Sequence, residues 1–177
     1  MRWGGLLGLT IFEPAPIPPH ETEREQAVIA SGALDARDDP ILLEIVEEAR
    51  RVFDTAMAAV SIVHRDWQYL IATAGLAGGP YSRRTSFCGH ALMSDERVLL
   101  VPDAAADSRF AGNPSVAEDG VLRFYAGAPL LDEGGWPLGT ICVFDPSPRD
   151  DFTDADAAKL IGMARRVVDR IRDRARG

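Results

Sequence analysis

Two runs of apolar and β-branched residues, 122–131 and 138–144, are separated only by the polar, glycine-containing stretch 132–135. Such a short break between alternating runs predicts a β-hairpin. A second pair of runs, 56–63 and 67–73, is interrupted by a two-residue polar turn and predicts another hairpin. Strands joined by hairpins favour an antiparallel sheet over a parallel one.

Amphipathic helices are predicted before the first hairpin and after the last. Asp38 or Asp39 can cap a helix that begins at Pro40 and continues to about residue 53. Thr153 can cap a final helix, in which apolar residues recur every three or four positions. We therefore expect an α+β fold of two layers, with both helices on one face of the sheet.

Two irregular stretches, 75–95 and 103–120, are left to cover the opposite face. The first contains a predicted short helix, 87–93, capped by Thr85 or Ser86. The second is long for a loop inside a compact domain, and such loops are often functional. A short strand at 98–101 separates them. We expect a pocket between these stretches and the sheet.

Length and composition narrow the class of protein. The 177 residues allow one domain, placed at 36–174, preceded by a flexible apolar and proline-rich tail, 1–35. A net charge of -8 opposes binding to nucleic acids or to anionic membranes, and no apolar stretch is long enough to span a bilayer. The sparse cysteines favour a reducing compartment, hence the cytoplasm. The Cys and His spacings match no zinc site, so no metal is expected.

Four sequence blocks, taken in order along the chain, resemble the GAF domain family, and in particular the GAF domains upstream of bacterial histidine kinase or diguanylate cyclase modules. The resemblance implies a PAS-like antiparallel sheet of five or six strands, a pocket opposite the terminal helices, and homodimerisation through those helices. It implies a sensing role without identifying the ligand or a cofactor. The blocks are RTSFCGHA at 84–91, VPDAAADSRFAGNP at 101–114, RFYAGAPL at 123–130 and GTICVFD at 139–145.

Charged candidates for ligand binding lie in the second irregular stretch. Arg109, with Asp103 and Asp107, could hold a polar ligand at the mouth of the pocket. The same carboxylates could instead cap turns through local backbone hydrogen bonds. Phe110 is expected to anchor the loop beside them.

Four further candidates are expected at the pocket wall. Tyr125 lies on the opposite face of its strand from the apolar Phe124 and Ala126, so we expect Tyr125 to face the pocket. Phe87 and Cys88 begin the short helix, and Cys142 lies in mid-strand. Cys88 could be a reactive thiol or, like Cys142, a small buried hydrophobic residue.

We expect a sensor that binds a small molecule, or a signalling partner acting in trans, and signals through its terminal helices. No motif assembles a nucleophile with a base, so an enzyme is not expected. The alternative is an enzyme similar to the free methionine-R-sulfoxide reductases, which are GAF proteins, with Cys88 and Cys142 as its cysteine pair. A bilin photoreceptor is disfavoured because the second irregular stretch contains no cysteine.

Overall fold

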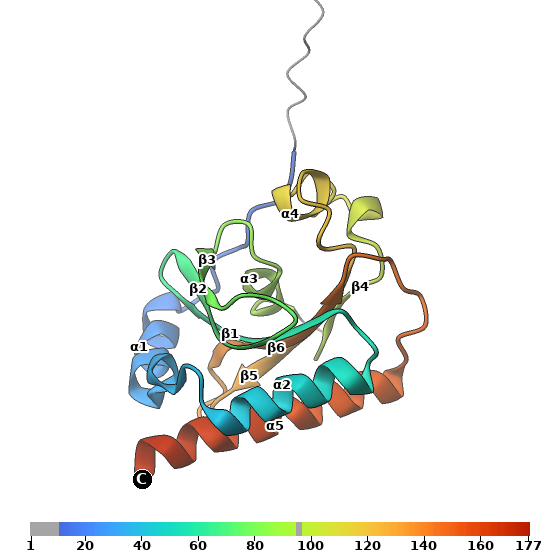
Figure 1. Ribbon diagram of the computed structural model, residues 1–177. Helices are drawn as coiled ribbons and strands as arrows, with labels where there is room; N and C mark the ends of the chain where they lie inside the picture. The colour runs from blue at the N-terminus through green and yellow to red at the C-terminus, as the bar shows by residue number, and fades with distance from the viewer. Residues whose placement is uncertain (1–10, 95–96) are drawn as a thin grey trace, which may run out of the picture.

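The computed structural model describes residues 11–94 and 97–177, which form a central sheet with helices on one face and short helices and loops on the other (Figure 1). The six strands are all antiparallel to their neighbours and lie in the order β3-β2-β1-β6-β5-β4. They are β1 (Met57–His64), β2 (Trp67–Ala74), β3 (Gly79–Ser82), β4 (Leu99–Val101), β5 (Phe124–Leu131) and β6 (Pro137–Asp145). Both expected hairpins, β1–β2 and β5–β6, are confirmed, and so is the α+β class.

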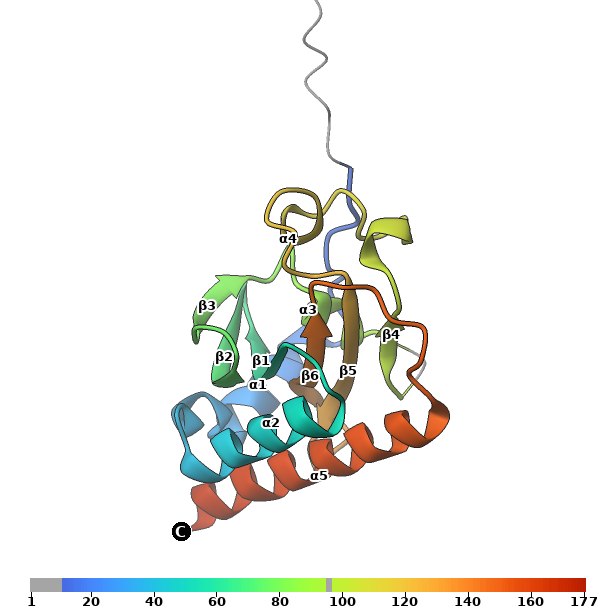
Figure 2. The same ribbon diagram turned by 45° about the vertical axis from the view of Figure 1, so that its right-hand side comes forward.

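One face of the sheet, called here the helix face, is covered by α2 (Pro40–Val52) and α5 (Asp154–Arg176) (Figures 1 and 2). Asp39 begins α2 by accepting hydrogen bonds from the amides of Ile41 and Leu42, as expected for a cap followed by proline. Thr153 and Asp156 form a reciprocal capping box at the start of α5. The apolar stripes of both helices pack on the sheet and form the larger of the two cores.

The opposite face, called here the loop face, carries α3 (Phe87–Ala91), η2 (Ala104–Ala106) and α4 (Pro114–Ala117). In Figure 2 these elements lie on the far side of the sheet from α2 and α5. A second, separate core lies between them and the sheet. The two cores confirm that side chains alternate between a helix-covered and a loop-covered face.

The structure differs from the expected flexible tail, 1–35, over residues 11–35, while residues 1–10 of that prediction lie outside the described residues. Residues 11–19 run in an extended conformation over the loop face, where the Glu13 and Ala15 amides donate to the carbonyls of Arg109 and Arg84. The chain then forms α1 (Glu21–Ser31) and η1 (Ala33–Ala36), whose buried residues join the helix-face core. We call residues 11–19 the N-terminal strap.

Candidate functional site

A cavity of about 310 Å³ lies between the loop face and the segments that cover it. Strands β1, β2, β5 and β6 form its floor, and β3, α3, α4 and the segment before β5 form its walls. Its lining residues are Met57, Gln68, Leu70, Leu76, Tyr81, Ser82, Thr85, Ser86, Phe87, Cys88, Ser115, Val121, Leu122, Tyr125, Cys142 and Phe144. None of these described residues carries a charged side chain.

The walls are held together by hydrogen bonds and ring stacking. Ser86 caps α3, with its hydroxyl accepting from the amide of Gly89 at 2.9 Å. Asn113 caps α4 and donates from Nδ2 to the Thr85 carbonyl at 2.9 Å, which joins the two irregular stretches. Phe110 is fully buried behind the cavity wall and stacks on Phe87 with a centroid distance of 4.0 Å. The structure therefore places Phe110 as the anchor of its loop, and Phe87 at the cavity itself.

Tyr125 faces the cavity from β5, whereas its neighbours Phe124 and Ala126 face the helices. This confirms the orientation expected from strand alternation. Its hydroxyl donates a hydrogen bond to Sγ of Cys88 at 3.4 Å. Burial, and then the nearby Cys88 thiol, raise the pKa of Tyr125 well above its ordinary value. The side chain is therefore a neutral hydrogen-bond donor.

Cys88 and Cys142 meet at the cavity floor although they are far apart in sequence. Their Sγ atoms are 3.9 Å apart, and both side chains are buried as free thiols. The hydrogen bond that Cys88 shares with Cys142 is the largest cause that lowers the pKa of Cys88 below its ordinary value. The same contact with Cys88, together with burial, raises the pKa of Cys142 well above its ordinary value.

Sequence reasoning missed the contributions of β1 and β2 to the floor. Gln68 and Leu70 of β2 line the cavity, and Oγ of Ser61 donates to Oε1 of Gln68 at 3.3 Å beneath it. Thr140 is also buried here, and its hydroxyl has no hydrogen-bond partner among the described residues. The alternation of β2, combined with the hairpin register, was the signal that could have found Gln68 and Leu70.

The charged candidates do not line the cavity. Asp103 accepts from the Ala105 amide and pairs with Arg123 at 2.7 Å, and this guanidinium lowers the pKa of the carboxyl. Asp107 accepts from the backbone amide of Arg109 and pairs with its guanidinium at 2.7 Å, which lowers the Asp107 pKa likewise. Of the two alternatives, the structure supports turn capping for both carboxylates.

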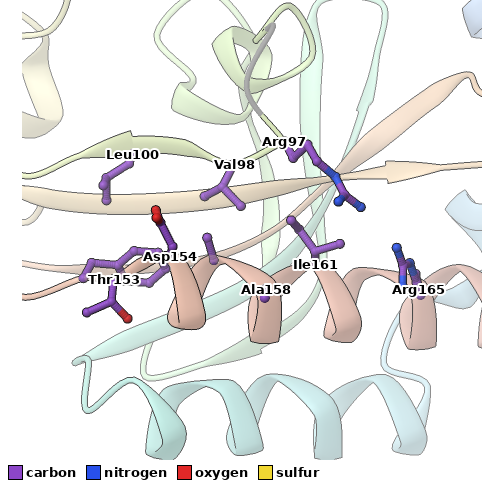
Figure 3. A pocket seen from close by; sticks show the side chains of 10 residues that line it. Arg97, Val98, Leu100, Thr153, Asp154, Ala158, Ile161 and Arg165 are labelled. Carbon is purple, nitrogen blue, oxygen red and sulfur yellow. The ribbon is translucent and has the colours of Figure 1, made fainter.

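A second, more polar hollow of about 500 Å³ lies at the other side of the sheet, between β4 and α5 (Figure 3). Val98 and Leu100 approach it from the strand and Ile161 from the helix, with Arg97 and Arg165 at one end. None of the eight residues expected at a binding site lines it. The loop-face cavity is therefore the candidate site.

The comparisons with known proteins agree with this architecture. The GAF domain family matches residues 39–171. The chain belongs to the GAF domain family.

A cyclic di-GMP phosphodiesterase of Pseudomonas aeruginosa is 38% identical over 156 residues, which cover 88% of this chain but only 26% of that protein. The chain thus spans about a quarter of the length of this curated relative.

Two solved structures show the same fold at low sequence identity. One is a domain attributed to a two-component sensor histidine kinase of Sinorhizobium meliloti, with TM-score 0.60, 17% identity, and coverage of 78% of this chain and 94% of that one. The other is a type II free methionine-R-sulfoxide reductase of Thermoplasma acidophilum, with TM-score 0.62, 14% identity, and coverage of 80% of this chain and 95% of that one. The family, the phosphodiesterase relative and the kinase domain together fit a signalling sensor domain. Among the described helices, none is both apolar and long enough to cross a lipid bilayer.

Proposed function

We propose that this GAF domain senses a small, uncharged and largely apolar molecule bound in the loop-face cavity. The observation that carries this proposal is the chemistry of the lining: aromatic and aliphatic walls, a few hydroxyl, thiol and amide groups, and no charged side chain among the described residues. Ligand sites of this kind bind apolar surface and use a few polar groups to orient the ligand. Phe87, Cys88, Tyr125 and Cys142 are the expected binding residues that contribute to the wall.

The same lining disfavours charged ligands. A phosphate or carboxylate moved from water into this cavity would lose its hydration without gaining a counter-charge. Cyclic nucleotides therefore fit the cavity poorly. The alternative function, reduction of free methionine sulfoxide, meets the same objection because a free amino acid carries both an ammonium and a carboxylate group. The relative's phosphodiesterase activity belongs to a protein of which the matched region makes up only 26%.

A connected set of aromatic contacts can carry the signal from the cavity to α5. Tyr125 lines the cavity, and its neighbour in the chain, Phe124, lies on the opposite face of the sheet. The ring centroid of Phe124 is 5.9 Å from that of Phe152. Phe152 immediately precedes the Thr153 cap of α5 and also packs on Phe53 at 5.6 Å, just after α2. A ligand that favours one position of β5 thus biases the packing of both terminal helices, provided that it binds two states unequally.

Binding is measured by thermal unfolding and by calorimetry. The probes are uncharged molecules of suitable size (indole, phenol and hexanol), compared with cyclic AMP, cyclic GMP and L-methionine. A ligand at 100 times its dissociation constant stabilises the folded state by about 2.7 kcal/mol, so an uncharged probe that binds should raise Tm measurably. Binding of only the charged probes, or of none at millimolar concentration, would refute the proposal.

A pair of variants shows where binding occurs. Leu122→Trp adds an indole group at the cavity wall and should abolish the Tm shift. Ile29→Trp adds a comparable volume on the exposed surface of α1 and should leave the shift intact. An equal loss in both variants would place binding outside the cavity.

Homodimerisation, a signalling partner acting in trans and a cytoplasmic location stay predictions. Light scattering coupled to size-exclusion chromatography measures the first directly, with and without a bound probe. A monomer at all concentrations would remove the dimer from the proposed signalling mechanism.

A further inference from the structure

Cys88 and Cys142 occupy an unusual position for two free cysteines in a protein core. One lies in the first turn of α3 and the other in the middle of β6, so the fold brings together residues separated by 54 positions. They are 4% and 1% exposed, yet both line the same cavity. Buried cysteines are usually inert because nothing can reach them, whereas here a small molecule can reach both sulfur atoms at once.

The sulfur atoms lie near each other, and side-chain movement has to close the remaining distance before a covalent bond can form. They are 3.9 Å apart, and a disulfide requires about 2.05 Å. The cavity provides space beside both side chains for this movement. Tyr125 donates its hydroxyl hydrogen to Sγ of Cys88, which stabilises negative charge on that sulfur atom.

We propose that Cys88 and Cys142 form a redox-active dithiol that a small, uncharged hydroperoxide oxidises to an intramolecular disulfide. Cys88 is the attacking thiol and Cys142 the resolving one. The lowered pKa of Cys88 agrees with its role as the attacking thiol. This inference does not require the sensed ligand of the proposed function.

The chemistry balances with hydrogen peroxide as the oxidant. Cys88 loses its proton to water, and its thiolate attacks one peroxide oxygen, so that an S–O bond forms while the O–O bond breaks. The leaving hydroxide takes up a proton and becomes water. The thiol of Cys142 then attacks the sulfenic sulfur of Cys88. The S–S bond forms, the S–O bond breaks, and the Cys142 proton passes to the departing hydroxide, which leaves as a second water. Two thiols and one peroxide give one disulfide and two waters, with two electrons passing from sulfur to peroxide.

The cavity selects the class of oxidant. Hydrogen peroxide and small alkyl hydroperoxides are uncharged and match a lining without charged groups. Glutathione disulfide is large and carries several charges, so it should oxidise the two cysteines at least tenfold more slowly than hydrogen peroxide does. This selectivity follows from access to the cavity, not from the reactivity of the thiols alone.

The reduced protein is treated with hydrogen peroxide and examined by intact mass and by peptide mapping without reduction. The expected product is about 2 Da lighter than the reduced protein and contains a Cys88–Cys142 cross-linked peptide. Cys142→Ser should stop at a sulfenic acid on Cys88, which dimedone traps. Cys88→Ser should leave Cys142 as a free thiol. Tyr125→Phe should slow oxidation about fivefold, the value of one lost hydrogen bond.

The controls separate reactivity from unfolding. Cys88→Ala and Cys88→Ser are compared by thermal unfolding, so that only folded variants are interpreted. Free cysteine in the same tube reports the oxidising power of the peroxide. The proposal is overturned if wild-type protein keeps two free thiols while that free cysteine is oxidised. It is equally overturned if both residues reach sulfonic acid without a cross-link. Neither outcome bears on the proposed ligand, which is tested by binding to the reduced protein.

Discussion

The ring of Tyr125 lies along its own strand, directly over Gly127. A β-carbon at position 127 would overlap the Tyr125 hydroxyl and lie 2.7 Å from Cζ of the same ring. Gly127 is therefore the residue that lets Tyr125 lie low over β5 and reach Cys88. The contact between the Tyr125 hydroxyl and Cys88 therefore depends on position 127 having no side chain.

Gly127→Ala should push the Tyr125 ring away from β5, towards the cavity. We expect a loss of about 1–3 kcal/mol in the free energy of unfolding, as for other overpacked cores, and slower oxidation of Cys88. Gly162→Ala is the control, because Gly162 lies within α5 and its β-carbon would meet open space. That substitution should stabilise the protein by about 0.5–1 kcal/mol. Urea unfolding measures both, and equal stabilities in the two variants would contradict the overlap.

Asp39 joins α2 to α5 through ionic hydrogen bonds, which makes acid sensitivity predictable. Its fully buried carboxylate caps α2 and pairs with Arg170 and Arg174 at 2.7 and 2.9 Å. The Arg170 hydrogen bond is the largest cause that lowers the Asp39 pKa below 3.8. Because the folded state holds this carboxylate ionised, the stabilisation is present above pH 3.8 and is lost as the pH falls towards the lower folded pKa.

Asp39→Asn keeps a cap but removes the charge, and should reduce the unfolding free energy by about 2 kcal/mol at pH 7. The difference from wild type should shrink as the pH is lowered below about 4, since wild-type Asp39 then becomes protonated on unfolding. Asp38→Asn is a matched control: its side chain is 77% exposed, and its positive φ suits asparagine. It should change stability by less than about 0.5 kcal/mol. A pH-independent Asp39→Asn difference would show that the ion pairs do not contribute.

The elements that could be predicted from the sequence are those whose own residues contain a helix cap or an apolar periodicity. Of the caps left open by the sequence, the structure selects Asp39 over Asp38 and Ser86 over Thr85, and it confirms Thr153. In contrast, α1 begins at Glu21 after His20, which provides no side-chain cap, and the buried residues of the helix are Arg24 and Val28. The apolar residues of α1 form a single run, Ala27–Ala30, so the helix gives no apolar periodicity to detect.

Edge strand β3 was beyond sequence reasoning for a similar reason, and Cys88 and Cys142 were paired only through the resemblance to the reductases. Gly79 and Pro80 are poor strand formers, and β3 pairs only with β2. The orientation of Tyr125 followed from alternation within one strand. The approach of Cys88 to Cys142 depends instead on how α3 docks on β6, which no local pattern encodes.

His90 connects α3 to the N-terminal strap, and its titration should loosen that contact. Its Nε2 lies 3.0 Å from the Glu13 carbonyl, and its ring packs edge-on against Phe110. Burial lowers the pKa of His90 below 6.5, so the folded state resists protonation. The unfolded state therefore binds the proton first, and stability should fall as the pH drops below about 6.5.

Hydrogen exchange of the Glu13 and Ala15 amides measures this effect, since both amides belong to the strap and donate to carbonyls of the loop face. Exchange corrected for intrinsic rates should be faster at acidic pH in the wild type. In His90→Gln, which keeps an uncharged donor, that pH dependence should disappear. An unchanged pH dependence in the variant would assign the effect to another group, such as Asp107, whose carboxylate also acts on His90.

Asn113 both starts α4 and ties it to the opposite cavity wall. Its Oδ1 accepts from the Ser115 amide at 3.1 Å, and its Nδ2 donates to the Thr85 carbonyl at 2.9 Å, with the side chain buried. Asn113→Asp preserves the acceptor and removes the donor, whereas Asn113→Ala removes both. We expect either variant to lose about 1–3 kcal/mol in the free energy of unfolding. Alanine should cost more if the cap of α4 is the larger contribution, and aspartate should cost more if the unpaired charge facing the Thr85 carbonyl is. Urea unfolding ranks the two variants.

In both Asn113 variants, freeing α4 from Thr85 should widen the cavity entrance and speed the oxidation of Cys88 by peroxide. An unchanged rate would mean that the oxidant enters the cavity elsewhere.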